Sequence, residues 1–471
     1  MSDSTVTSIW WIRRDLRLVD NEALTAAAAK GPVIPLFIHE ARSDALGAAP
    51  RWRLEQSLKA LALQLEHKGL RLVLRKGEAL DVLRAVVSET GARAVHWGRL
   101  YDPVSRHIDA DVKAALRADG LAAESHAGQL LHEPMTVKTK VGDYYKVFSP
   151  FWRAIEPLGV AAPLPEPAKL LPPAAWPASE NLLDWTLSSA MRRGASVLAR
   201  HSTAGEAAAW AKMTRFLDER ASNYKAARDQ VATAGTSDLS DNLAYGEISP
   251  RSIWATGQAA TAAGVRGLEP FLRQVGWRDF AHHLMFHTPH MLKDNWREGW
   301  DSFPWSEDET EAKVWAWKYG RTGVDFVDAA MRELWVTGKM HNRARMVAAS
   351  YLTKHMMVHW RVGERWFADQ LIDFDPANNA MGWQWVAGSG PDAAPYFRVF
   401  NPDTQLQKFD PERRYFKRWV AEGQREAPET ALDFYESIPK SAGLSPKAVR
   451  PQPIVGLKEG RERALAAYSS K

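Results

Sequence analysis

The chain has 471 residues, of which 45% are hydrophobic and 25% charged, and it carries a formal net charge of +5. This composition is typical of a globular protein, and the length is enough for about two to four domains. No stretch reaches the roughly 20 apolar residues of a membrane span, and the first residues lack the segments of a secretory signal. The absence of cysteine excludes disulfides, thiol catalysis and cysteine-bound iron–sulfur clusters, and it is compatible with a reducing cytoplasm.

Residues 8 to about 120 alternate strand-like segments with helical ones. Four segments rich in branched and aromatic residues predict strands: IWWIRR, PVIPLFI, LRLVLR and AVHWG. The stretches between them are rich in alanine and leucine and predict helices, as in NEALTAAAAK, RWRLEQSLKALALQLEHKG and ALDVLRAVVSETG. This alternation predicts a parallel sheet wrapped by helices, so we expect a Rossmann-like α/β domain over residues 1–132. No GxGxxG motif follows the first strand, so the usual dinucleotide fingerprint is missing.

The rest of the chain has a different character. Residues 133–195 are expected to connect two domains, because the part from 157 to about 187 is rich in proline. Beyond about residue 190, strand-like segments almost vanish and apolar residues recur at helical spacing. Residues 196–471 are therefore predicted to form an all-α domain.

Residues 339–400 hold the densest group of unusual motifs: MHNRARM, DFDPANN and GWQW. Ordinary core packing does not need these motifs together. Arg345 could pair with Asp373 or Asp375, and one of these aspartates could also accept an N–H from a heterocycle. The motifs therefore predict a buried aromatic cofactor. On the aspartates and the arginine alone, a helix cap with a buried ion pair is an equally good interpretation. No metal site is expected, because no second carboxylate or histidine lies at ligand spacing.

Two further segments have a composition that suits phosphate binding. GTSDLS, at residues 235–240, offers hydroxyl and backbone donors to phosphate oxygens. Its alternative interpretation is an N-cap, in which Ser237 or Ser240 opens the next helix. KFDPERRYFKRW interleaves basic and aromatic residues, as surfaces that contact nucleic acid do.

Tryptophan is over-represented, with 21 residues. Core packing is the default interpretation for each one, because indoles bury large apolar areas. In GWQW, Trp383 and Trp385 would share a face in a strand and would diverge by about 200° in a helix.

Taken together, these motifs resemble the photolyase/cryptochrome family over essentially the whole length. WWIRRDLRLVDNEAL, YKVFSPFWRA, GTSDLS, GRTGVDFVDAAMRELWVTGKMHNRARM and DFDPANNAMGWQW occur in the order of that family. The resemblance implies an FAD cofactor, folded in a U shape within the helical domain. The residues implied to bind FAD are Tyr224, Thr236, Ser237, Leu239, Ser240, Arg345, Asp373, Asp375 and Asn379.

The same resemblance implies roles in electron transfer and in DNA binding. Asn379 would face flavin N5. An aspartate at this position is typical of plant cryptochromes, so the amide of Asn379 favours a repair enzyme. Trp383, Trp360 and Trp305 would form an electron-transfer chain from the flavin to the surface. The residues implied to contact the lesion or the DNA phosphates are Gln274, Trp277, Asn342, Arg343, Met346, Trp385, Arg398 and Lys408.

Several positions depart from the family pattern. Gln274 stands where many relatives carry a carboxylate that contacts the lesion. Lys339 replaces a usual aromatic residue, and Asp238 stands where others have a basic one. Val104 and Ser105 replace the Asn–Glu pair with which some relatives bind a folate. Taken with DFDPANNAMGWQWV, these departures resemble the class III photolyases of cyclobutane pyrimidine dimers.

The α/β domain has no catalytic constellation of its own, so it is expected to hold a second, antenna chromophore. The class III resemblance implies methenyltetrahydrofolate, bound by Glu40 of the α/β domain and Lys293 of the helical domain. On sequence alone, a solvated acid at Glu40 and a surface charge at Lys293 are equally good interpretations.

The function implied by the resemblance is light-dependent repair of UV-damaged DNA. The enzyme would split cyclobutane pyrimidine dimers under blue light, using an electron from reduced FAD, and would act as a monomer in the cytoplasm. One alternative is a cryptochrome-like photosensor, which Asn379 and the lack of a long C-terminal extension disfavour. The other alternative is repair of (6-4) photoproducts. That activity is typical of relatives with a histidine at the position of Asn342, or, in the bacterial form, with cysteine-bound iron and sulfur.

Overall fold

A five-stranded parallel sheet forms the centre of the N-terminal domain. The computed structural model describes residues 6–192, 194–392 and 397–471. In the described chain every strand pair of the sheet is parallel, in the order β3-β2-β1-β4-β5. The strands are β1 (Ser8–Ile12), β2 (Val33–His39), β3 (Val73–Lys76), β4 (Ala94–Gly98) and β5 (Ala122–His126). The predicted α/β fold is thereby confirmed.

Helices cover both faces of this sheet. Trp10 packs on one face with Leu24 and Leu58, while its neighbour Trp11 packs on the other face with Leu83. Successive side chains of a strand point to opposite faces, so adjacent tryptophans enter two separate cores. The helices of this domain are α1 (Glu22–Lys30), α2 (Ala41–Asp44), α3 (Ala48–His67), α4 (Ala79–Thr90) and α5 (Pro103–Ala118).

The fifth strand is the one that sequence patterning missed. Its sequence is AAESH, and two of its five residues are exposed. An edge strand needs few apolar residues, because it pairs on one side only and borders solvent. β5 therefore lacks the apolar run by which the other four strands were predicted.

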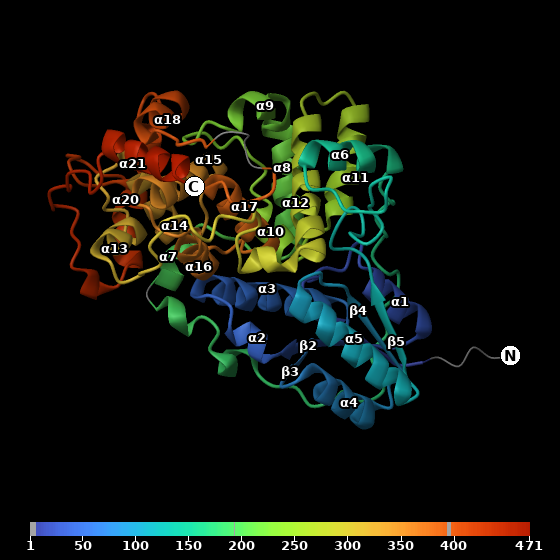
Figure 1. The fold of residues 1–471 in the computed structure, drawn as a ribbon. Helices are drawn as coiled ribbons and strands as arrows, with labels where there is room; N and C mark the ends of the chain where they lie inside the picture. Colours follow the sequence, from blue (N-terminus) through green and yellow to red (C-terminus); the bar gives the residue numbers. More distant parts are fainter. Residues whose placement is uncertain (1–5, 193, 393–396) are drawn as a thin grey trace.

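The C-terminal domain is helical, as predicted (Figure 1). No helix among the described residues is long and apolar enough to cross a membrane. Its α-helices, together with α6 of the connector, are α6 (Phe148–Ile155), α7 (Gly194–Ala199), α8 (Glu206–Glu219), α9 (Tyr224–Ala227), α10 (Ser240–Ala244), α11 (Pro250–Ala262), α12 (Glu269–His287), α13 (Ala312–Lys318), α14 (Asp325–Thr337), α15 (Asn342–Ser350), α16 (Trp360–Gln370), α17 (Pro376–Ala387), α18 (Pro402–Phe409), α19 (Arg414–Trp419), α20 (Glu429–Ser437) and α21 (Leu457–Ser469). Short helical turns are η1 (Glu156–Leu158), η2 (Leu182–Trp185), η3 (Ser189–Met191), η4 (Ala221–Asn223), η5 (Pro289–Leu292), η7 (Lys440–Ala442) and the π-helical η6 (Tyr351–His355).

The proline-rich connector runs alongside the α/β domain before it enters the helical one (Figure 1). The backbone N–H of Val33 donates to the carbonyl of Leu171 (2.9 Å), and the N–H of Glu180 donates to the carbonyl of Leu74 (2.8 Å). These bonds attach the connector to β2 and β3. The segment is therefore part of the packed structure and not a free linker.

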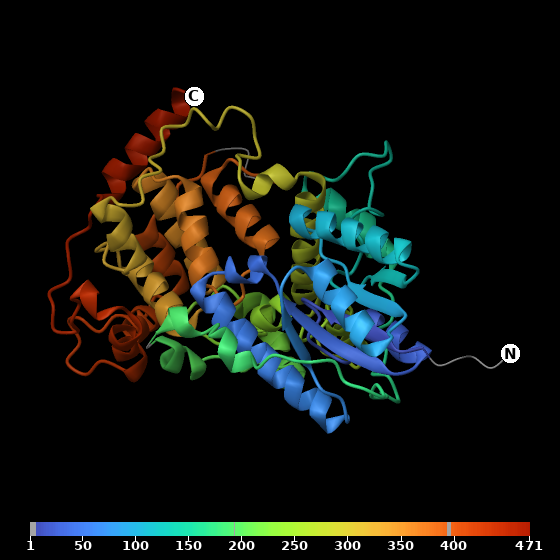
Figure 2. The same cartoon turned by 90° about the horizontal axis from the view of Figure 1, so that it is seen from below.

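The two domains meet along α3, which lies against the helical domain (Figures 1 and 2). Across this boundary Arg53 pairs with Glu247 (2.6 Å), and Arg251 pairs with Asp20 (2.7 Å). Gly246 adopts a positive φ of 66°, and a Cβ there would lie 1.9 Å from the carbonyl oxygen of Arg14. Only glycine allows this close approach, so the boundary is tightly fitted.

Candidate active site

Helix α17 is the centre of the candidate site, because it packs against α12, α15 and α16. Asp375 caps its N-terminus by accepting from the N–H of Asn378 (2.8 Å), and Pro376 occupies the first turn. An aspartate followed by proline is a strong helix start, so DFDPANN forms a helix for local reasons. Trp383 and Trp385 both lie on this helix and therefore diverge. Trp383 is buried and Trp385 is half-buried.

An ion pair joins α15 to the loop before α17. Arg345 Nη2 donates to Asp373 Oδ2 (2.7 Å), and Arg345 Nε donates to the carbonyl of Met340 (2.8 Å). The other carboxylate oxygen, Asp373 Oδ1, is buried and has no hydrogen-bond partner among the described residues. A buried acceptor without a partner is costly unless a ligand supplies a donor. Asp373 is therefore arranged to accept an N–H from a bound molecule.

Asp375 points the other way, toward α12. Its Oδ2 lies 2.8 Å from His282 Nε2, while its Oδ1 is taken up by the helix cap. Burial alone would raise the pKa of Asp375, but the His282 imidazole and the cap hydrogen bonds hold it well below its usual range. Asp375 is therefore an ionised, fully bonded carboxylate that anchors α17 to α12. Sequence reasoning missed His282, since nothing local marks it.

Asn379 lies one helical turn after Asp375 and is almost fully buried. Its amide nitrogen donates to Glu364 Oε1 (2.8 Å) and to the carbonyl of Glu364 (3.1 Å). With the nitrogen side thus engaged, the amide oxygen is left as an acceptor. Burial raises the pKa of Glu364 to about 7. Glu364 was also missed from sequence, although it lies one turn after Trp360 on α16.

Three predicted tryptophans run from the buried centre toward the surface. Trp383 packs directly on Gly363 of α16, where a Cβ would lie 2.1 Å from the indole ring. Gly363 is one turn from Trp360, which is fully buried and donates its N–H to Asn295 Oδ1 (2.8 Å). Trp305 is half-buried and donates to the carbonyl of Thr353 (2.7 Å). Trp305 is therefore the most exposed of the three, while Trp383 and Trp360 are buried.

The turn that contains GTSDLS leads into α10. Leu239 is buried, Thr236 and Ser237 are half-buried, and Ser240 is the first residue of the helix. The N-cap interpretation is wrong, because the N-cap residue is Leu239 and no side chain makes a cap hydrogen bond. The hydroxyls of the turn are therefore not used as caps. Nearby, Tyr224 is buried at the start of α9, edge-on to two phenylalanine rings.

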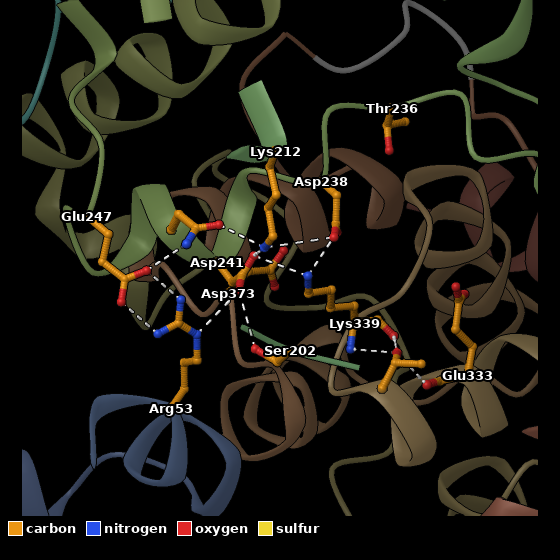
Figure 3. A network of polar contacts seen from close by, with 12 residues as sticks. Arg53, Ser202, Lys212, Thr236, Asp238, Asp241, Glu247, Glu333, Lys339 and Asp373 are labelled. Atoms are coloured by element: carbon orange, nitrogen blue, oxygen red, sulfur yellow. Dashed lines mark hydrogen bonds and ion pairs between the residues drawn. The ribbon is translucent and has the colours of Figure 1, made fainter. Parts of the chain in front are cut away.

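A network of charged side chains adjoins this turn (Figure 3). Lys339 Nζ lies 2.8 Å from Asp238 Oδ1 and 3.1 Å from Asp241 Oδ1. Lys212 Nζ also contacts Asp241 (3.0 Å), and Arg53 contacts Asp241 from the α/β domain (3.3 Å). The side chain of Asp241 is fully buried. Lys339 and Asp238 are thus direct partners.

Two of the residues predicted to contact DNA share one cavity. Trp385 and Arg398 both line a cavity of about 260 Å³, together with Trp300, Lys354 and Tyr468. Its lining is aromatic and cationic, which suits a stacked base and a phosphate. Among the described residues, Gln274, Trp277, Asn342, Arg343, Met346 and Lys408 do not line this cavity.

The remaining predicted DNA contacts have protein partners. Trp277 stacks on Phe148, with ring centroids 3.7 Å apart and planes at 12°. Gln274 Oε1 accepts from Arg228 Nη2 (3.2 Å), and Arg343 Nη2 lies 2.8 Å from Asp229. Asn342 and Met346 contact each other one turn apart on α15. Lys408 is exposed in the last turn of α18.

A second cavity, of about 190 Å³, lies between the two domains. Glu40 and Arg42, at the start of α2, line it on one side, and His282 and Asp375 from the helical domain line it on the other. Arg42 Nε donates to Glu40 Oε2 (2.9 Å). Burial raises the pKa of Glu40. Lys293 is exposed and is not among the described residues that line this cavity.

One group of side chains in the described chain has the composition of a metal site, although no metal site was expected. His96, Glu124 and His126 lie on β4 and β5, with ligand atoms within 4.8 Å of one another. His96 Nδ1 lies 3.0 Å from His126 Nε2. The group belongs to the α/β domain and does not adjoin α17.

Comparison with known proteins gives matches along nearly the whole chain. Residues 8–168 match the DNA photolyase family model, and residues 271–470 match the FAD-binding domain of DNA photolyase. The chain is 45% identical to the deoxyribodipyrimidine photo-lyase of Agrobacterium fabrum, covering 100% of this chain and 99% of that protein. It is 34% identical to Cryptochrome-1 of Arabidopsis thaliana, covering 98% of this chain and 70% of that protein. A class III photolyase structure from Agrobacterium tumefaciens superposes with a TM-score of 0.91 at 44% identity, covering 99% and 98% of the two chains.

Proposed function

The chain belongs to the DNA photolyase family, and we propose that it is a light-dependent deoxyribodipyrimidine photo-lyase that splits cyclobutane pyrimidine dimers in UV-damaged DNA. One observation carries this proposal. Asp373 presents a buried oxygen without a partner, and Asn379 on the adjoining helix is held with its amide oxygen available. Two acceptors from the FAD-binding domain of this family fit the ring N–H groups of a reduced flavin.

The residues present fit FAD as the resident cofactor. Arg345 and Asp373 would hold one edge of the flavin ring. The amide oxygen of Asn379 would accept a hydrogen bond from the N–H at N5. Tyr224, Thr236, Ser237, Leu239 and Ser240 would hold the phosphates and the sugar chain. Bound reduced FAD supplies, on excitation by light, the single electron that opens the cyclobutane ring and that returns when both bonds are broken.

The protein contributes a neutral, water-poor surrounding for this chemistry. Because Asn379 is an amide, it accepts a hydrogen bond without adding a negative charge. Burial raises the pKa of Glu364, which orients it, to about 7, so near neutral pH this acid carries less negative charge than an ordinary glutamate. We infer that Asn379 and Glu364 together limit the negative charge next to the reduced flavin ring.

The tryptophan chain would convert oxidised FAD to the reduced form that repair requires. Trp383 is packed on α16 one turn from Trp360, and Trp305 is the most exposed of the three. Electrons would enter at Trp305 and move inward through Trp360 to Trp383. Asn295 and the carbonyl of Thr353 fix two of the indoles through their N–H groups.

DNA would be held through its backbone, with the lesion turned out of the helix. Flipping a damaged nucleotide costs a few kcal/mol, and less than for an intact pair. Trp385 offers a stacking surface in the cavity of about 260 Å³, and Arg398 borders the same cavity. Arg343, Arg398 and Lys408 would contact phosphates, and Gln274, Trp277, Asn342 and Met346 would border the lesion.

A repair assay tests the proposal and separates it from its alternatives. Reduced protein is mixed with DNA that contains either cyclobutane dimers or (6-4) photoproducts and is illuminated with blue or near-UV light. We expect loss of the cyclobutane dimers only. Repair of the (6-4) product alone would reassign the lesion, and no repair of either, with FAD bound, would favour a photosensor.

We further propose that the interdomain cavity of about 190 Å³ takes part in binding an antenna chromophore, methenyltetrahydrofolate. Glu40 would accept N–H groups of the pterin, and Lys293 would pair with the glutamate tail outside the cavity. Gently purified protein should show a near-UV band beyond that of FAD, which Glu40→Ala removes. Flavin bands alone, with no gain on adding the folate, would contradict the assignment. Size-exclusion chromatography should give a monomer.

A further inference from the structure

Two oppositely charged residues that lie 101 positions apart in sequence are brought into contact. Asp238, in the turn before α10, meets Lys339, which precedes α15 (2.8 Å). Lys339 also reaches Asp241 in α10 (3.1 Å), so one lysine bridges the turn and the helix that follows it.

The surrounding network is balanced in charge (Figure 3). Lys339 and Lys212 face Asp238 and Asp241, and Arg53 faces both Asp241 and Glu247. Three cations thus meet three carboxylates. Because the side chains of Arg53, Asp241 and Glu247 are fully buried, an unpaired charge among them would be strongly destabilising.

Lys339 and Lys212 both face the two acids, and Lys339 lies closer to Asp238 (2.8 Å) than Lys212 does (3.8 Å). Burial alone would lower the pKa of Lys339, but Asp241 and Asp238 raise it above its ordinary value. The ammonium group is therefore charged near neutral pH. Removing that charge would leave Asp238 and Asp241 with a net negative charge beside the phosphate-binding turn.

We propose that Lys339 is a determinant of FAD affinity: it neutralises the acid at position 238, so that the turn can accept the negatively charged diphosphate of FAD. The inference rests on the proposed binding of FAD phosphates by residues 236–240. It goes beyond that proposal by giving a role to a residue outside the turn. It also accounts for an acid in a phosphate-binding turn, where an acid would otherwise repel the ligand.

A charge-deletion cycle tests the pair. The dissociation constant of FAD is measured on reconstituted apoprotein by quenching of flavin fluorescence, for wild type, Lys339→Met, Asp238→Asn and the double variant. Lys339→Met should weaken FAD binding by about ten- to a hundredfold, more at low salt than at high salt. Asp238→Asn should bind at least as tightly as wild type. The double variant should recover most of the affinity, because two cations again face two carboxylates.

The controls separate charge from folding and from repair. Lys458→Met removes an exposed lysine of α21 and should leave the dissociation constant unchanged. Circular dichroism of each apoprotein reports folding, and Lys339→Arg should keep tight binding. If the double variant binds as weakly as Lys339→Met, or if Lys339→Met binds as tightly as wild type, the inference is wrong. Tight FAD binding by the wild type without repair of cyclobutane dimers would count against the proposed function alone.

Discussion

The two domains bury their polar groups in different places. In the α/β domain most of the buried strand side chains are apolar, as at Trp11, Ile34 and Val95, with His39 and His96 as exceptions. Its buried charges lie mostly in loops and at the domain boundary. In the helical domain, polar groups such as Asp373 and Asn379 lie inside the bundle, between helices. Buried polar groups lower stability unless they are paired, so those in the helical domain indicate a function rather than a folding need. The chemistry therefore belongs to the helical domain, and the α/β domain supports it.

The largest effect on FAD affinity should come from breaking an ion pair of the helical domain, with an ion pair of the α/β domain as the control. Asp373→Ala leaves Arg345 without its carboxylate and removes the acceptor for the cofactor, so FAD affinity should fall by about a hundredfold or more. Asp109→Ala breaks an equally close pair with Arg13 in the α/β domain (2.6 Å) and should leave FAD affinity unchanged. Equilibrium dialysis of FAD measures both variants. Equal losses of FAD affinity in the two variants would refute the assignment of cofactor binding to the helical domain.

Tryptophan substitutions should show the same contrast in electron transfer. Trp383→Phe should slow photoreduction of oxidised FAD by about tenfold or more, because it removes the donor on the helix of the flavin site. Repair by chemically pre-reduced enzyme should stay nearly intact, since the lesion does not receive its electron through Trp383. Trp97→Phe, at a fully buried indole of β4, should alter neither. Equal loss of both activities in Trp383→Phe would indicate a packing role instead.

DNA binding should also depend on the helical domain. Arg398→Ala should weaken binding to damaged duplex and reduce the slope of log affinity against log salt by about one. Sequence preference should not change, because phosphate contacts carry no base information. Arg84→Ala, at an exposed arginine of α4, is the matched control. Fluorescence anisotropy at several salt concentrations measures DNA binding by both variants. An unchanged slope for Arg398→Ala would show that Arg398 makes no phosphate contact.

Sequence reasoning succeeded where structure is local and failed where it depends on distant segments. The four apolar strands were predicted from composition, whereas β5 was not, because an edge strand of sequence AAESH carries little apolar signal. The helix cap in DFDPANN was among the interpretations open from sequence, because a capping aspartate and a proline act on the next residues. Glu364 and His282 were missed, since each meets α17 from another helix, 15 and 93 positions away. No local pattern reports such contacts.

The smallest predicted effect concerns the pH dependence of stability. Burial raises the pKa of Glu364 from 4.5 to about 7 in the folded protein. Between these values the native state holds a proton that the unfolded state has lost, so stability falls as pH rises from about 4.5 to about 7. The contribution lost by pH 8 is on the order of 1–3 kcal/mol.

Glu364→Gln isolates this contribution, because Asp279 and Glu333 also have pKa values raised by burial to about 7. The amide keeps an oxygen to accept from Asn379 but cannot ionise. In urea unfolding, Glu364→Gln should match the wild type at pH 5 and exceed its stability at pH 8. In the α/β domain, Glu89→Gln changes an exposed acid paired with Arg75 on the surface and should give no such gain at pH 8. If the two substitutions shift stability alike at both pH values, the buried acid beside Asn379 is not the source of the pH dependence.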